Sequence, residues 1–168
     1  MILFRTHYTL GELMSGTEAG RSQKASSCAV ELVTTYHELK KENLLEKFKA
    51  FFHIGSKQMN AYYVTFHFKV TSDSGNSHNV YIRTAPDFNA SLGGGNKVKI
   101  YCDCEDFKFR SAYELASHDS LLLTAKTVAS LSQALGQKPK TSKTLLCKHS
   151  MAAVQWLMNN YSSVMSNL

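Results

Sequence analysis

Residues 62–84 show the alternation of apolar and polar positions that is typical of half-buried β-strands. Five apolar residues take every second position at the start of this stretch: Tyr62, Val64, Phe66, Phe68 and Val70. A segment rich in turn-forming residues follows at 71–77, and the alternation resumes over 78–84. This order predicts an antiparallel hairpin with one apolar face. His67 and His78 fall on the less apolar face or in the turn, and we interpret them as ordinary solvated or edge histidines.

Other regions place apolar residues at helical spacing. Residues 26–52 predict one or two helices, with Val30, Val33 and Tyr36 among the apolar positions. Further helices are predicted over 120–135 and after His149. Residues 1–23 are interrupted by glycines and predict an arm more than an element of the core: Gly11, Gly16 and Gly20.

These elements predict the α+β fold class. We expect a small antiparallel sheet of about three strands, including one at 98–104, with N-terminal helices, a helical insertion and a C-terminal helix. We divide the chain into an N-terminal arm at 1–23, a helical segment at 24–55 and an α+β domain at 56–168, with the insertion at about 111–144. A chain of 168 residues that is 43% apolar can bury a core. No stretch reaches the roughly 18 apolar residues of a membrane span, so we expect no membrane partner.

Candidate chemistry concentrates in two short pairs of residues. Cys102 and Cys104 are separated by one residue, and after 42 further residues Cys147 and His149 are again separated by one. A strand over 98–104 turns both thiols of the first pair toward its apolar face. The second pair stands on the first turn of the C-terminal helix, where the positive end of the helix dipole favours a thiolate. Three sulfur ligands and one imidazole predict a tetrahedral zinc site.

Two other interpretations of the cysteines stay open. Buried free cysteine behaves as a small hydrophobe, so the thiols could be inert core residues. A disulfide between Cys102 and Cys104 is less favourable, because alternate Cα atoms of an extended chain lie about 6.5 Å apart, near the limit for that bond. Three of the four cysteines fall inside the two pairs, which favours zinc. Cys28 has no nearby partner and is interpreted as a buried helix residue.

The residues around the two pairs resemble a known zinc-finger family. The stretch at 98–115 contains Cys-Asp-Cys-Glu-Asp-Phe with a basic and aromatic continuation, and Leu-Cys-Lys-His stands at 146–149. This pattern resembles the SWIM-type zinc finger, in which Cys-x-Cys is followed at a variable distance by Cys-x-His. More particularly, it is similar to a subgroup encoded by tailed bacteriophages among their virion genes. The resemblance covers about residues 96–160, and the long spacer implies an insertion within the finger.

The resemblance implies a non-enzymatic structural or assembly subunit of a tailed-phage virion. The tail, baseplate or neck is favoured over the capsid shell, and the implied partners are other virion subunits. One structural zinc ion would be held by Cys102, Cys104, Cys147 and His149, because four protein ligands leave no position for water. The implied locations are the virion and, during assembly, the host cytoplasm.

Catalysis and nucleic-acid binding are the competing function classes. The sequence lacks Gly-x-Ser-x-Gly, a phosphate-binding glycine loop and His-Glu-x-x-His, so we expect neither an enzyme nor a small-molecule substrate. The net charge of +6, from 19 basic and 13 acidic residues, is only mildly basic. Lys138, Lys140 and Lys143 lie in a polar segment and are the candidate phosphate contacts. A nucleic-acid-binding accessory protein with a SWIM-like finger is therefore the second hypothesis.

Overall fold

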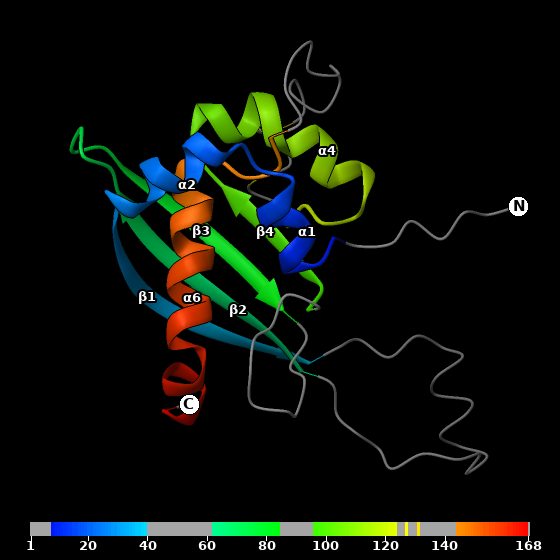
Figure 1. Cartoon of the computed structure of the whole chain (residues 1–168). Helices are drawn as coiled ribbons and strands as arrows, with labels where there is room; N and C mark the ends of the chain where they lie inside the picture. Colours follow the sequence, from blue (N-terminus) through cyan, green and yellow to red (C-terminus); the bar gives the residue numbers. More distant parts are fainter. Residues whose placement is uncertain are drawn as a thin grey trace, which may run out of the picture.

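The computed structural model describes residues 8–39, 62–84, 96–123, 127, 131 and 144–167. The elements are α1 (Leu10–Ser15), α2 (Ala19–Ser26), β1 (Ala29–Leu39), β2 (Tyr62–Thr71), β3 (Ser77–Thr84), β4 (Val98–Cys102), the π-helical turn η1 (Phe107–Ser111), α4 (Ala112–Ser117) and α6 (Lys148–Ser166). The strands form one antiparallel sheet in the order β1-β2-β3-β4, and α1, α2 and α6 lie against one of its faces (Figure 1). The predicted α+β fold class is confirmed, with four strands in place of about three.

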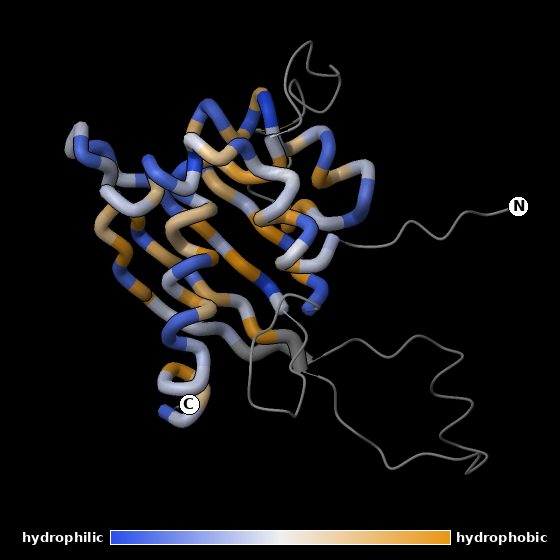
Figure 2. Tube along the Cα trace, viewed as in Figure 1, coloured by the Kyte–Doolittle hydropathy of each residue, from blue (hydrophilic) through white to orange (hydrophobic). Residues whose placement is uncertain are grey.

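β2 and β3 form the predicted hairpin. Thr71 pairs with Ser77 next to the turn, and the amide of Gly75 donates a hydrogen bond to the carbonyl of Ser72 at 2.9 Å. Gly75 has a φ of 82°, a left-handed conformation that glycine adopts without steric cost. Apolar and polar residues alternate along these strands (Figure 2), so one face of the hairpin turns toward the core.

The helix predicted over residues 26–52 is wrong for its first part. Ala29–Leu39 forms strand β1, which pairs with β2 along its whole length. The register with β2 shifts at Val33, which forms a β-bulge. Val30, Val33 and Tyr36 are three positions apart in the sequence, a spacing that imitates a helical period. In the strand, Val30 lies opposite buried Val70 whereas Val33 and Tyr36 are exposed, so pairing with β2 overrides that local signal. The remainder of the predicted helix lies outside the described residues.

The N-terminal region belongs to the core, so the predicted arm is wrong for the residues that the structure describes. Thr9 caps α1, because its hydroxyl accepts a hydrogen bond from the amide of Glu12 at 3.2 Å, and the Glu12 carboxylate accepts one from the amide of Thr9 at 2.8 Å. Leu10 and Leu13 are fully buried. The Thr-x-x-Glu capping box was the sequence signal for this helix. Residues 1–7 lie outside the described part of the chain.

The segment between the two ligand pairs starts with η1 and α4 and then returns to the sheet. Residues 120–122 run alongside β4, where the amide of Ile100 donates a hydrogen bond to the carbonyl of Ser120 at 2.9 Å. The helix predicted to begin at residue 120 is therefore wrong at its start, although Thr127 and Leu131 are helical. The other residues between 124 and 143 are not among those described.

A hydrophobic core fills the space between the sheet and its helices. α6 contacts every strand (Figure 1), and Phe66 and Phe68 of β2 are fully buried beneath it. The ring centroids of these residues lie 6.1 Å from Tyr161 and 5.6 Å from Trp156, respectively. Because successive strand residues face opposite sides, these contacts identify the helix-covered face of the sheet. Among the described residues, no helix combines the length and the apolar character that a membrane span requires.

Candidate metal centre

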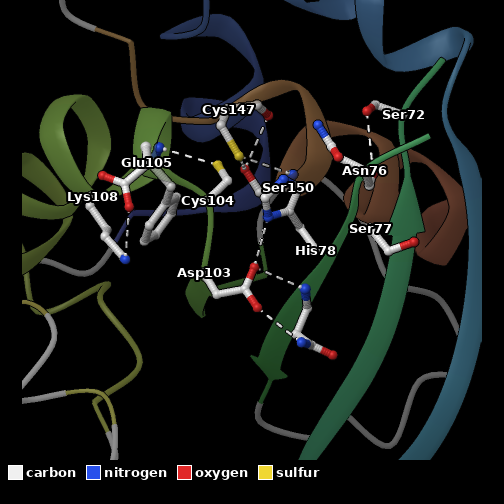
Figure 3. Close-up of polar contacts among 12 residues, drawn as sticks. Ser72, Asn76, Ser77, His78, Asp103, Cys104, Glu105, Lys108, Cys147 and Ser150 are labelled. Atoms are coloured by element: carbon white, nitrogen blue, oxygen red, sulfur yellow. Dashed lines mark hydrogen bonds and ion pairs between the residues drawn. The ribbon is translucent and has the colours of Figure 1, made fainter. Parts of the chain in front are cut away.

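The two predicted ligand pairs meet between the end of β4 and the start of α6. Cys102 is the last residue of β4, Cys104 follows two positions later, and Cys147 and His149 stand at the beginning of α6. All four side chains are buried, and their ligand atoms lie within 4.8 Å of one another. Figure 3 shows Cys104 and Cys147 with their polar neighbours. These four residues, which we call the Cys3His cluster, could hold a metal ion.

The first pair is positioned by the end of β4 and the turn that follows it. Cys102 lies opposite Val80 of β3, and both residues are fully buried on the helix-covered face. The chain then enters a helical turn, and the sulfur of Cys104 accepts a hydrogen bond from the amide of Phe107 at 3.3 Å. The carbonyl of Cys104 accepts another from the amide of Lys108 at 3.2 Å. Cys104 therefore acts as the cap of this turn, in addition to offering a ligand atom.

Cys147 caps the start of α6 in the same way that Cys104 caps the turn after β4. It is the N-cap residue of the helix, and its sulfur accepts a hydrogen bond from the amide of Ser150 at 3.4 Å. The hydroxyl of Ser150 lies 3.2 Å from the same sulfur. Amide donors and the positive end of a helix dipole both stabilise a thiolate. These hydrogen bonds therefore support the prediction that the start of the helix favours a thiolate at Cys147.

Burial and mutual hydrogen bonding set the charges of the three thiols. Burial raises the pKa of Cys102 well above its ordinary value, and hydrogen bonds to the other two sulfurs add to the effect. A hydrogen bond from Cys102 lowers the pKa of Cys104, but its hydrogen bond to Cys147 and its burial outweigh this, so the pKa is raised. Burial also opposes ionisation of Cys147, yet hydrogen bonds from both other thiols, from His149 and from Ser150 hold its pKa well below the ordinary value. Without a cation, therefore, only Cys147 is favoured as a thiolate. A cation among the three sulfurs would allow all of them to ionise.

His149 supplies a further reason to expect a metal ion. Its side chain is only 5% exposed, and neither ring nitrogen forms a hydrogen bond of good geometry among the described residues, although the ring interacts with the Cys147 sulfur. Buried polar atoms without partners are uncommon in folded proteins and call for an explanation. A metal ion at the Cys3His cluster would give one of the two nitrogens a partner.

A histidine and a carboxylate support His149 from the side of the sheet. The ring of His78, at the start of β3, packs on the His149 ring with centroids 4.4 Å apart and planes tilted by 41°. Asp103, between the first two cysteines, lies 3.0 Å from Nδ1 of His78 and accepts hydrogen bonds from the backbone and side-chain amides of Asn79 at 3.1 and 2.9 Å (Figure 3). The sequence interpretation of His78 as an ordinary solvated histidine missed this contact. No spacing signal could reveal it, because the contact depends on the register of β3 with β4.

Ion pairs join the surroundings of the cluster to the rest of the fold. Asp106, just after the first ligand pair, is paired with Arg21 of α2 and also with Arg110 at 3.2 Å. Lys148 stands between Cys147 and His149, and its Nζ atom lies 3.8 Å from Oδ1 of Asp73 in the turn of the hairpin. These contacts hold both ligand-bearing segments against neighbouring elements.

The remaining sequence candidates lie apart from the cluster. Lys138, Lys140 and Lys143 are outside the described residues, so their role as phosphate contacts stays a prediction. Cys28 is half-buried between α2 and β1, and not within a helix as predicted. Every cysteine of the chain is a free thiol, which argues against a disulfide.

Comparison with known proteins adds no relative from which a role could be transferred. A scan against protein-family models finds no matching family, and searches of curated proteins and of solved structures find no match. The interpretation of the Cys3His cluster therefore rests on its donor atoms, its burial and its hydrogen bonds.

Proposed function

We propose that the chain is a zinc-stabilised, non-enzymatic structural subunit of a tailed-phage virion, in the tail, baseplate or neck. The observation that carries the proposal is the buried Cys3His cluster, whose ligand atoms lie within 4.8 Å of one another. The virion assignment is supported by the resemblance of residues 96–160 to SWIM-type proteins of tailed phages. The partners are then other subunits of the particle.

Zinc suits this donor set better than other common metals. Structural zinc sites combine thiolate and imidazole donors, whereas calcium and magnesium take oxygen ligands and iron–sulfur clusters take mostly cysteines. With zinc–sulfur bonds of about 2.3 Å, the ligand atoms of a tetrahedral site lie about 3.8 Å apart. Because no two ligand atoms of the cluster are more than 4.8 Å apart, a contraction of about 1 Å or less would close it around one ion.

We propose a structural role for the metal, because four protein ligands complete its tetrahedral shell. A catalytic zinc keeps one position for water or substrate. None of the four ligand residues is more than 5% exposed, so solvent has little access to the cluster. The ion would instead link β4 to α6 across the 42 residues between Cys104 and Cys147. Part of its binding free energy then becomes free energy of folding.

Metal analysis of the purified chain tests the zinc assignment. We expect one zinc ion per chain, and we expect Cys147→Ser to lose it because one thiolate ligand is removed. Cys28→Ser is the matched control, since Cys28 is also a free thiol but is not part of the cluster. Unchanged zinc content in Cys147→Ser, or loss of zinc in Cys28→Ser, would contradict the assignment.

Mass spectrometry of purified particles tests the virion assignment separately. We expect the chain in particles of the phage that encodes it, in a fixed ratio to the other structural proteins. Particles that contain none of it, while the infected host contains it in quantity, would refute a virion role and leave the zinc assignment intact.

A nucleic-acid-binding accessory protein is the second candidate function. It is favoured by the basic net charge of +6, with Lys138, Lys140 and Lys143 as the candidate phosphate contacts.

A further inference from the structure

The two edges of the sheet differ in how the described part of the chain covers them. At β4, the amide of Ile100 donates to the carbonyl of Ser120 at 2.9 Å, and the carbonyl of Ile100 accepts from the amide of Leu122 at 3.0 Å. The amide of Val98 donates to the carbonyl of Tyr8 at 3.4 Å. β1 forms the other edge (Figure 1), and among the described residues no strand pairs with its outer side. A further strand can therefore be added to the described sheet only at β1.

The alternation of hydrogen bonds across the sheet shows which residues of β1 direct their backbone groups outward. The carbonyl of Asn79 in β3 accepts from the amide of Asp103 at 3.2 Å, so Asn79 directs its backbone groups away from β2. Successive residues of an antiparallel strand direct these groups to opposite sides. Following this alternation through the pairing of β3, β2 and β1, Tyr36 bonds to β2, whereas Thr35 and His37 direct N–H and C=O outward.

β1 has few of the features that protect an edge strand from pairing. It is 11 residues long and contains neither lysine nor proline, whereas protected edges are often short or contain one of these residues. Its first half does have such features, a charge at Glu31 and a bulge at Val33. The second half, residues 34–39, pairs with β2 without a register shift. This half is therefore a regular strand that a second strand can join.

Apolar surface is exposed along the same strand. Val33 is 49% exposed and Tyr36 is 48% exposed, and they are two of the four large apolar residues that are exposed in the described part of the chain. Tyr36 lies near the middle of the regular half of β1. An aromatic side chain at such a position stabilises strand pairing when another aromatic stands opposite it.

We propose that β1 pairs with β1 of a second copy of the chain, antiparallel and about a two-fold axis at Tyr36. Tyr36 then stands opposite Tyr36 of the second copy. Thr35 stands opposite His37 of the second copy, and their outward backbone groups form hydrogen bonds in both directions. No glutamate of β1 stands opposite another glutamate of β1, so the pairing brings no like charges together. The two four-stranded sheets become one continuous sheet.

A second copy is the occupant because this pairing closes on itself. Both copies use the same strand, so the interface is isologous and the assembly ends at a dimer. The hydrogen bonds of Ile100 with Ser120 and Leu122 cover the β4 edge, which prevents growth of the sheet into a fibre. This inference depends neither on the identity of the metal nor on the virion assignment.

Sedimentation velocity of the full zinc-loaded chain over a range of concentrations tests the proposal. We expect a reversible equilibrium between monomer and dimer. Thr35→Pro should weaken dimerisation about ten-fold or more, because it removes two hydrogen bonds between the copies and none to β2. Tyr36→Lys should weaken it by a similar factor, because it places two positive charges opposite each other. Since Tyr36 is exposed, this second variant keeps the test valid if Thr35→Pro does not fold.

Cysteine cross-linking tests the register of the two strands. Tyr36→Cys should give a disulfide-linked dimer on mild oxidation, because the Cα atoms of such an opposed pair lie about 4.5 Å apart, within the range of a disulfide. Glu31→Cys is the matched control, since Glu31 is also exposed on β1 but its two copies would lie about 30 Å apart. The wild-type chain, with its free thiols, gives the background. Circular dichroism and zinc content should be unchanged in each variant.

Three results would overturn the proposal. The first is a wild-type chain that stays monomeric up to about 100 μM, which would leave the edge to a different partner. The second is a dimer that neither Thr35→Pro nor Tyr36→Lys weakens. The third is a disulfide-linked dimer that Glu31→Cys forms as readily as Tyr36→Cys, or that neither variant forms, which would exclude a two-fold axis at Tyr36.

Discussion

Removing the metal should lower the stability of the chain by an amount that the spacing of the ligands predicts. The metal cross-links Cys104 to Cys147 across 42 residues. Closing a loop of about 45 residues with one cross-link is worth about 4 kcal/mol of unfolding free energy at 25 °C in the chain-entropy model. For a domain of this size, 1 kcal/mol corresponds to about 2–4 °C in Tm, so we expect chelation to lower Tm by about 8–16 °C.

The chain carries its own probe for this measurement. Trp156 is its one tryptophan and lies on α6, with its ring centroid 5.6 Å from that of Phe68 in the core. A thermal scan followed by tryptophan fluorescence therefore reports directly on the contact between α6 and the sheet. Scans of the zinc-loaded chain, the chelated chain and the chelated chain after zinc is restored should show that Tm falls and then recovers.

Hydrogen exchange gives the local counterpart of the thermal scan. The amide of Ser150 donates to the sulfur of Cys147, and the amide of Met151 donates to its carbonyl. Both amides should exchange faster after chelation, while amides of the hairpin should change less. A Tm change below about 2 °C, with removal of the metal verified by elemental analysis, would refute the idea that the ion stabilises the fold as a cross-link.

Three further predictions concern the capping of α1, the support of the ligand histidine and the core. Thr9→Ala should lower the free energy of unfolding by about 1 kcal/mol in urea, because it removes the α1 cap. The hydrogen bonds from Thr9 lower the pKa of Glu12. The stability that these bonds give the fold should therefore be complete above the ordinary carboxyl pKa and be lost as pH falls through the lowered pKa. An NMR titration of Glu12 that shows no lowered pKa would contradict this. Asp103→Asn should weaken zinc binding about 10- to 100-fold in competition with a chromophoric chelator, because it disturbs the residues that support His149. Phe66→Ala should cost about 3–5 kcal/mol in urea unfolding, since its ring is fully buried.

The parts of the fold that the sequence predicts correctly have a signal that is local in the chain. The hairpin of β2 and β3 combines strict alternation with a turn that contains Gly75, and α6 has regular helical spacing after an N-cap residue. In both cases a few consecutive residues contain the periodicity, the boundary and the buried face. No distant partner is needed to recognise them.

The errors occur where a partner or a cap overrides the local pattern. β1 has apolar residues three positions apart in the sequence, and only its pairing with β2, with a bulge at Val33, makes it a strand. α1 is short and glycines lie close to it in the sequence, so the spacing of its apolar residues alone does not predict a helix. The capping box of Thr9 and Glu12 is the signal that does. Residues 120–122 follow the edge of β4, which is a tertiary contact.

The donor atoms of the cluster were predictable for a different reason. Each pair needs only two residues separated by one, and that spacing is visible in the sequence. What brings the pairs together is the packing of α6 on the sheet, which spacing does not specify. The roles of His78 and Asp103 depend on that same packing, so the residues that support His149 could be found only in the structure.

The cluster also determines which residues of β4 face away from the helices. In β4, Cys102 faces the helices while its neighbour Tyr101 faces the other side, next to Tyr81 in the paired strand. A slip of one residue in the register of β4 would exchange these faces and turn Lys99 inward. A metal ion bound to Cys102 opposes that slip, because the thiol must stay on the side of α6. The metal centre and the position of Lys99 on the face of the sheet away from α6 are therefore two consequences of one strand register.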